Sequence, residues 1–293
     1  MELDFVKLKE IKPALSEYIR ETQALLKQAA VQDEKAVHDV RVLMKKSRAV
    51  MKLIASQMDE ESYNREYLTF REVGRITRSW RETSVHRKTL KELKKKYSEI
   101  FTLLGANEKL ESLMKKAEIS EEPGADLKDD LENIDGILNK AGFRVRFRNM
   151  NNLDPKVLLN ELDKTYISVV DKYLICRNNP KPVNLHKFRK RAKDFLYQLF
   201  FFRALNPSVV KALEKKLDLM TQNLGKFNDL AQLIDTLEYK YSGLPDQPAL
   251  DELILLIHDE QDRYLSKVWP VAYKVFCPGQ KLVNLLGFRI LMI

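Results

Sequence analysis

The chain has 293 residues, of which 44% are hydrophobic, and it carries a formal net charge of +9. This length allows one large or two ordinary domains with a real core, and the positive excess favours polyanionic partners. The sequence excludes a disulfide framework or a zinc cage, because Cys176 and Cys277 form no spaced pair. It also excludes a membrane-spanning helix, because no window approaches roughly 20 apolar residues. We therefore expect a cytoplasmic protein.

Helical periodicity runs through almost the whole sequence, which contains only 9 Gly and 10 Pro, so the expected fold class is all-α. Asp154-Pro155 and Asn206-Pro207 each look like an N-cap followed by proline at the first helical position. The one candidate strand is 143–148, where Phe143, Val145 and Phe147 alternate with three arginines. The predicted helices lie near 13–30, 34–56, 62–97, 107–118, 125–141, 154–177, 184–204, 207–240 and 248–275.

The charge is spread unevenly along the chain. Residues 71–96 hold ten Lys or Arg against three Glu, whereas 118–135 and 246–262 hold eight and six acidic residues. Local basic fields are therefore steeper than the net charge suggests. The sequence leaves open whether the acidic segments guard a basic site or bind a partner. The apolar tail, 276–293, is interrupted by charges, and we expect it to dock on the body rather than to enter a membrane.

The second predicted helix contains VHDVRVLMKKSR, residues 37–48. At about 100° per residue, four of its cationic side chains fall within a wedge of roughly 80°. Neighbouring like charges on a helix repel one another by a few tenths of a kcal/mol per pair. The row therefore indicates either a solvated face or an anionic partner. Its members are His38, Arg41, Lys45 and Arg48, and Lys52 extends it by one turn.

A second copy of this row occurs in LHKFRKRAKDFLY, residues 185–197. There His186, Arg189 and Lys193 repeat the spacing of the first row at an offset of 148 residues. Downstream, 81–82 aligns with 228–229 at an offset of 147. This pattern predicts a duplicated helical bundle, with one repeat at about 10–142 and the other at about 154–275. A pseudo-two-fold axis would then bring the two cationic helices together.

Two facing cationic helices would form one positive cleft, which a bound polyanion would stabilise. Arg offers a planar fork to phosphate, Lys a mobile charge, and Tyr197 a hydroxyl donor on the same wedge. Lys46, Lys187 and Arg191 fall outside the wedge, and we expect them to be solvated. The candidate binding residues are His38, Arg41, Lys45, Arg48, Lys52, Arg78, His186, Arg189, Lys190, Lys193 and Tyr197.

The paired H-x-x-R-x-x-x-K rows, with LGKFNDLAQLIDTL at 224–237, resemble the CHAD domain, the conserved histidine α-helical domain. The resemblance runs from about residue 10 to 275 and implies two pseudo-symmetric four-helix bundles around a central basic groove. It also implies binding of inorganic polyphosphate, often at polyphosphate granules, by the His rows and Tyr197. The first repeat departs from the family pattern, because Glu82 replaces Asp and no Gly precedes it. The triphosphate-hydrolysing domain to which many members are fused is not indicated, so we expect a stand-alone domain.

Other functions are open at this stage. The net charge predicts weak, non-specific nucleic-acid binding through phosphates, but the sequence contains no base-reading motif. A metal-dependent phosphohydrolase would need carboxylate-held magnesium, and the acidic segments lie far from the basic rows in sequence. The neighbours of His38 and His186 are Arg and Lys, which repel divalent metals. We therefore expect a non-enzymatic protein with no cofactor and no metal.

Overall fold

The computed structural model describes residues 6–28, 34–105, 125–150, 152–241 and 248–287, and every regular element in these ranges is helical. The all-α prediction is confirmed. Two short 3-10 turns, η1 at Ala55–Gln57 and η2 at Phe200–Phe202, follow α2 and α9. The helices are α1 (Leu8–Gln28), α2 (Glu34–Ile54), α3 (Glu60–Ile76), α4 (Ser79–Lys96), α5 (Ser98–Leu103), α7 (Ala125–Phe147), α8 (Pro155–Asn178), α9 (Pro182–Leu199), α10 (Pro207–Tyr241), α11 (Pro248–Phe276) and α12 (Leu282–Leu285).

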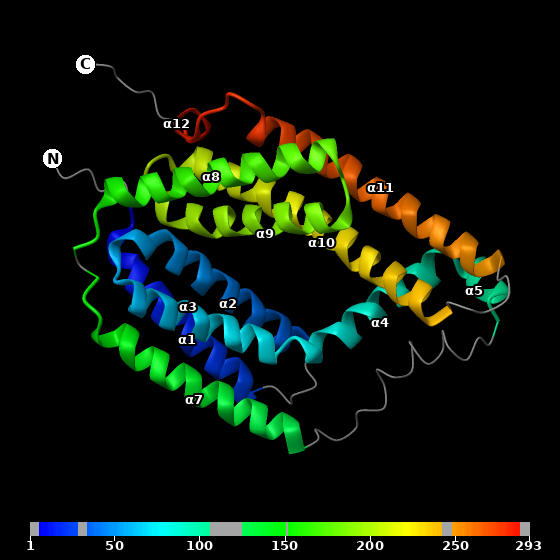
Figure 1. Ribbon diagram of the computed structural model, residues 1–293, viewed down its shortest axis with the longest axis horizontal. Helices are drawn as coiled ribbons and strands as arrows, with labels where there is room; N and C mark the ends of the chain where they lie inside the picture. Colours follow the sequence, from blue (N-terminus) through cyan, green and yellow to red (C-terminus); the bar gives the residue numbers. More distant parts are fainter. Residues whose placement is uncertain (1–5, 29–33, 106–124, 151, 242–247, 288–293) are drawn as a thin grey trace.

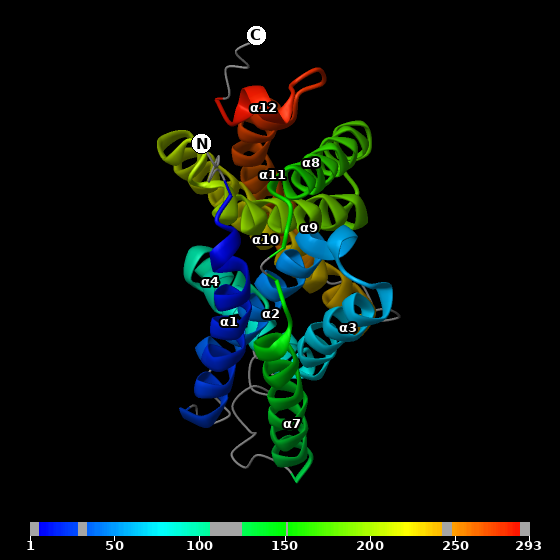
Figure 2. The same ribbon diagram turned by 90° about the vertical axis from the view of Figure 1, so that its left-hand side faces the viewer.

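The helices lie in two groups (Figures 1 and 2). One group contains α1, α2, α3 and α7, and the other contains α8, α9, α10 and α11, with α2 packed against α9 between them. A single cluster of buried hydrophobic residues runs through both groups. Helices α4 and α5 leave the first group and pack through a second cluster on α10 and α11. The two groups are therefore joined by their cores and by the α4–α5 arm.

Two predicted helix starts have the expected chemistry. The Asp154 side chain accepts a hydrogen bond from the backbone N–H of Lys156, and Pro155 takes the first helical position. Pro207 likewise opens α10, and the Asn206 side chain accepts from the backbone N–H of Val209 at 3.4 Å. Side-chain capping of this kind satisfies backbone donors that have no partner within the helix.

The predicted strand at 143–148 is wrong, because α7 continues as a helix to Phe147. Ala141 and Val145 are buried one turn apart, whereas Phe143 and Phe147 are exposed on the opposite side. Arg144 makes a two-pronged ion pair with Glu66 of α3, at 2.5 and 2.9 Å. Alternating apolar residues over six positions also satisfy an i, i+4 pattern, so the period could not be decided from so short a stretch.

The predicted helix over 62–97 is interrupted between α3 and α4. The Thr77 hydroxyl donates to the carbonyl of Val73, and the N–H of Arg78 turns back to the carbonyl of Arg75. The carbonyl of Gly74 instead accepts from Arg41 of α2 at 2.7 Å. A tertiary contact therefore takes over a backbone group at the end of α3, which propensity along the sequence does not reveal. The predicted helix at 107–118 lies outside the described residues.

The segment after α11 lies on the body of the molecule. Leu282 and Leu286 are buried, and the Tyr166 hydroxyl donates to the carbonyls of Val275 and Gln280 at 2.8 and 3.2 Å. The last part of the predicted docked tail, 288–293, lies outside the described residues. None of the helices in the described ranges is long and apolar enough to cross a bilayer.

Candidate functional site

Helices α2 and α9 are joined towards their C-terminal ends. The Lys52 ammonium lies 2.6 Å from the Asp194 carboxylate. The buried Gln198 side chain donates to the carbonyl of Ala49 at 3.0 Å. These contacts hold the two helices together at one end, and they set the spacing of the cationic side chains that lie nearer the N-terminal ends.

The structure brings cationic side chains of α2 and α9 close to one another. Lys45 of α2 lowers the pKa of His186 on α9, and Lys46 of α2 lowers the pKa of Lys193 on α9. Charges exert such effects only over short distances in a protein. Positive side chains of α2 and α9 therefore lie in one field. We refer to them as the α2–α9 cation cluster, which comprises Lys45, Lys46, His186, Arg189, Lys190 and Lys193.

Arg41 and Arg189, which are equivalent by the 148-residue offset, make matching contacts. Arg41 donates from Nη1 to the carbonyl of Gly74 and lies 3.3 Å from the Thr77 hydroxyl. Arg189 donates from Nε to the carbonyl of Thr221 at 3.1 Å. Gly74 and Thr221 are 147 residues apart. Each arginine is thus held against the helix that follows its own, α3 in one case and α10 in the other.

Gly225 allows Arg189 to lie close to α10. A Cβ atom at Gly225 would come within 2.9 Å of Nη2 and 3.2 Å of Nε of Arg189. At Gly74, in contrast, a Cβ atom would meet no described atom within 4 Å. Glycine within a helix is unfavourable by about 1 kcal/mol relative to alanine, so its presence at 225 needs a reason. The close approach of the guanidinium supplies that reason.

His186 is held in one orientation by α10. Its Nδ1 lies 2.9 Å from Oδ1 of Asn228. Because Oδ1 only accepts, Nδ1 carries the proton, and Nε2 is the nitrogen that changes protonation. Burial is the largest cause that lowers the pKa of His186, and the charges of Lys190, Arg189 and Lys45 lower it further. The hydrogen bond to Asn228 acts in the opposite direction.

Lys193 and Tyr197 form the more buried part of the site. The Lys193 ammonium lies 3.0 Å from Asp218 and 5.6 Å from the centre of the Tyr197 ring. Burial lowers the pKa of Lys193, with Asp218 opposing, and burial raises the pKa of Tyr197 to about 12. Tyr197 therefore keeps its O–H at neutral pH and can donate a hydrogen bond.

The remaining candidates occupy different settings. His38 is exposed, as is Lys190 of the cluster, and Arg78 lies at the junction of α3 and α4. Arg48 donates from Nε to the carbonyl of Met44 in its own helix at 3.3 Å. Lys52 is engaged by Asp194 and is thus part of the joint between α2 and α9 rather than of the cluster.

Lys46 and Arg191 are not simply solvated, contrary to the prediction. The Lys46 ammonium lies 5.5 Å from the centre of the Tyr18 ring on α1, in addition to its effect on Lys193. Arg191 lies 3.6 Å from Asp194 and is 28% exposed. Lys187 is exposed, as expected. A wedge drawn on one helix misses such residues, because a neighbouring helix also contacts side chains beside the wedge. No sequence signal pointed to Tyr18.

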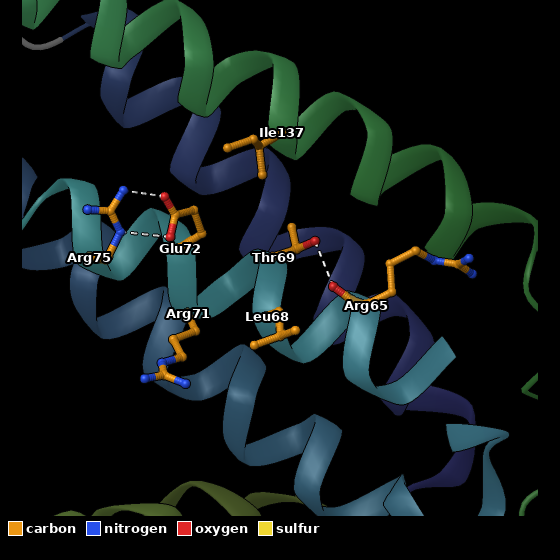
Figure 3. A pocket seen from close by; sticks show the side chains of 7 residues that line it. All are labelled: Arg65, Leu68, Thr69, Arg71, Glu72, Arg75 and Ile137. Atoms are coloured by element: carbon orange, nitrogen blue, oxygen red, sulfur yellow. Dashed lines mark hydrogen bonds and ion pairs between the residues drawn. The ribbon is translucent and has the colours of Figure 1, made fainter. Parts of the chain in front are cut away.

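A hollow elsewhere on the surface is lined by two further arginines of the 71–96 segment, Arg71 and Arg75. It lies between α3 and α7, and Glu72 holds Arg75 in a two-pronged ion pair at 2.8 and 2.6 Å (Figure 3). Within the described part of the chain, no group of three or more His, Cys, Asp or Glu side chains could hold a metal ion. The hollow is lined by Arg65, Leu68, Thr69, Arg71, Glu72, Arg75 and Ile137.

A comparison with known families agrees with the resemblance that the two His-Arg-Lys rows indicated. The model of the CHAD domain matches residues 13–238, which is more than half of the chain and includes α2, α9 and most of α10. The chain belongs to the CHAD domain family. The match confirms the resemblance to this family. No curated protein matches the chain.

Proposed function

We propose that this CHAD protein binds inorganic polyphosphate in a basic groove between α2 and α9, without catalysing a reaction. The proximity of Lys45 to His186 and of Lys46 to Lys193 carries the proposal. Several cations held together are unfavourable until an anion joins them, and each phosphate of the polymer would supply a negative charge. Family membership supports association with polyphosphate. The protein would act in the cytoplasm, at polyphosphate granules.

In this proposal the two helix groups are pseudo-symmetric four-helix bundles, and the groove lies on the axis between them. The matching contacts of Arg41 with Gly74 and of Arg189 with Thr221 support the symmetry. Lys45 and Lys190 would meet the polymer as mobile charges, the two arginines through their planar guanidinium groups, and Tyr197 through its hydroxyl. Binding would be multivalent and reversible.

The proposal is tested by removing one arginine at a time. Arg41→Ala and Arg189→Ala are each expected to weaken polyphosphate binding by about 1–3 kcal/mol, the range for losing a charged hydrogen bond. Affinities would be measured by calorimetric titration with long-chain polyphosphate. Lys187→Ala removes a cation from the exposed side of α9 and should leave the affinity nearly unchanged. Unchanged affinity in both arginine variants would contradict the groove assignment.

The position of Arg189 can be changed without removing its charge. Gly225→Ala places a methyl group within 2.9 Å of the Arg189 guanidinium, which must move away from Thr221. We expect polyphosphate affinity to fall by about tenfold, equivalent to about 1.4 kcal/mol. Gly74→Ala is the matched control, because the new methyl group meets no described atom within 4 Å. Both changes favour the helix, so equal affinities in the two variants would contradict the role of Arg189.

Binding should strengthen as the pH falls, because His186 would take up a proton. In the free protein burial and the nearby cations hold its pKa below the ordinary value of about 6.5, and a bound polyanion would raise it. Between the pKa of His186 in the free protein and its pKa in the complex, each fall of one pH unit should raise the affinity by at most about tenfold. Titrations from pH 8 down to pH 5.5 with the native protein and His186→Gln would measure the effect. A pH dependence that is the same in both proteins would contradict the assignment.

The same shift has the opposite consequence for the free fold. The folded protein disfavours the protonated form of His186, so the pKa of His186 is lower in the folded state than in the unfolded state. The free energy of unfolding is therefore highest above about pH 6.5. It decreases as the pH falls from about 6.5 through the lower pKa of the folded state. Polyphosphate should therefore raise the melting temperature more at pH 5.5 than at pH 8. A larger rise at pH 8 would contradict the linkage.

A further inference from the structure

The outer face of α7 carries a row of exposed residues that the polyphosphate site does not use. α7 packs against α1 and α3, and it lies at the edge of the molecule (Figure 2). At about 100° per residue, the exposed members fall within a wedge of roughly 80° that points away from both neighbours. We call this row the α7 outer face. It comprises Asp129, Glu132, Gly136, Lys140, Phe143 and Phe147.

Two aromatic rings stand together at one end of the α7 outer face. Phe143 and Phe147 are each 67% exposed, and their ring centres lie 4.6 Å apart. Scattered single hydrophobic residues are normal on a protein surface, whereas exposed aromatic rings that lie side by side are of the kind enriched at protein interfaces. Arg146 lies over the Phe147 ring at 5.7 Å, so the patch also has a basic edge.

Gly136 lies in the middle of the α7 outer face, where the monomer gives no reason for glycine. A Cβ atom there would meet no described atom within 4 Å, and the residue is exposed within a regular helix. Glycine weakens a helix relative to alanine, but it permits close approach of another backbone. The position therefore fits a point at which a second helix crosses α7.

The charges on the α7 outer face would pair with those of a second α7 that runs in the opposite direction. Glu132 lies four residues before Gly136, and Lys140 lies four residues after it. Both side chains are exposed, and no ion pair joins either of them to another described residue. If a second α7 crosses antiparallel at Gly136, Glu132 of one copy lies beside Lys140 of the other, and the pair occurs twice. A two-fold contact needs exactly this kind of self-complementary surface.

We propose that the α7 outer face is an interface between two copies of this chain, with two antiparallel α7 helices crossing at Gly136. Phe143 and Phe147 of each copy are buried against the N-terminal half of the other copy's α7, and the two Glu132–Lys140 pairs flank the crossing point. The proposal does not depend on polyphosphate binding, because α7 lies outside the α2–α9 cation cluster.

The test is sedimentation velocity of the full chain without polyphosphate, over a hundredfold range of protein concentration. We expect a monomer–dimer equilibrium in the native protein. Phe143→Ser combined with Phe147→Ser should leave only monomer. At a protein concentration at which the native chain is also monomeric, the variant should melt at the native temperature, because both rings are exposed in the monomer. Gly136→Leu should weaken the dimer by at least tenfold. A native chain that stays monomeric would overturn the proposal and leave the patch to a different partner.

Charge reversal tests the antiparallel arrangement separately from hydrophobic association. Glu132→Lys and Lys140→Glu, each alone, place like charges together twice and should weaken the dimer about tenfold. The double variant Glu132→Lys with Lys140→Glu restores both pairs in reversed form and should regain the native dissociation constant. A double variant as weak as the single variants would overturn the antiparallel pairing. Lys187→Glu, on α9, is the control for the change of net charge.

Discussion

Lys45→Glu is expected to weaken polyphosphate binding by about 3 kcal/mol, or ~100-fold, which is the larger of our expected effects on affinity. The variant loses a charged contact and adds a carboxylate that repels the polymer. It acts where α2 approaches α9, because Lys45 belongs to α2 and lowers the pKa of His186 on α9. Calorimetric titration with long-chain polyphosphate measures the loss.

Lys187→Glu is the matched control for Lys45→Glu, since it changes the net charge by the same amount. Lys187 is exposed and lies outside the cluster. We expect its affinity to stay within about threefold of the native value, because exposed charges are well screened at physiological salt. Equal losses in the two variants would show that net charge, rather than the arrangement between α2 and α9, determines binding.

Asp194→Asn is expected to lower the free energy of unfolding by about 3 kcal/mol, which is the largest effect that we expect on stability. The Asp194 carboxylate is 16% exposed and lies between Lys52 at 2.6 Å and Arg191 at 3.6 Å. A neutral amide would leave two partly buried cations facing each other. The melting temperature should fall by about 5 °C for a chain of this size.

The control for Asp194→Asn is Asp171→Asn, which removes an exposed carboxylate from α8. Substitutions on an exposed surface usually change stability by no more than about 0.5 kcal/mol. Thermal unfolding followed by circular dichroism would compare the two variants. If Asp194→Asn melts at the native temperature, the ion pairs with Lys52 and Arg191 do not stabilise the joint between α2 and α9.

The sequence predicted the helical class and the two cationic rows because both depend on local spacing. Buried positions of α2 such as Val40 and Met44 follow the helical period, so its polar face could be drawn correctly. The break between α3 and α4 could not be predicted, because Arg41 reaches the carbonyl of Gly74 from another helix. The short 143–148 stretch satisfied two periods, and only its packing against α3 decides between them.

The candidate site was predicted less completely than the fold. The position of a residue on its helix face distinguishes Lys45 from Lys187. It does not show which cation forms an ion pair with a carboxylate on a neighbouring helix. Lys52 is thus paired with Asp194 although it continues the cationic row. Lys46 enters the cluster because α1 and α9 both approach that side of α2. Such information depends on how helices cross, and therefore on contacts distant in sequence.

The most direct test of polyphosphate binding is a calorimetric titration of the native protein with long-chain polyphosphate at near-physiological salt. Single-stranded RNA and DNA of matched total charge would be titrated in parallel. We predict tight binding of polyphosphate and weak binding of both nucleic acids, because the α2–α9 cation cluster offers closely spaced phosphate contacts without base-reading groups. Equal affinity for all three polymers would contradict the account and reduce the paired rows to a generic basic surface.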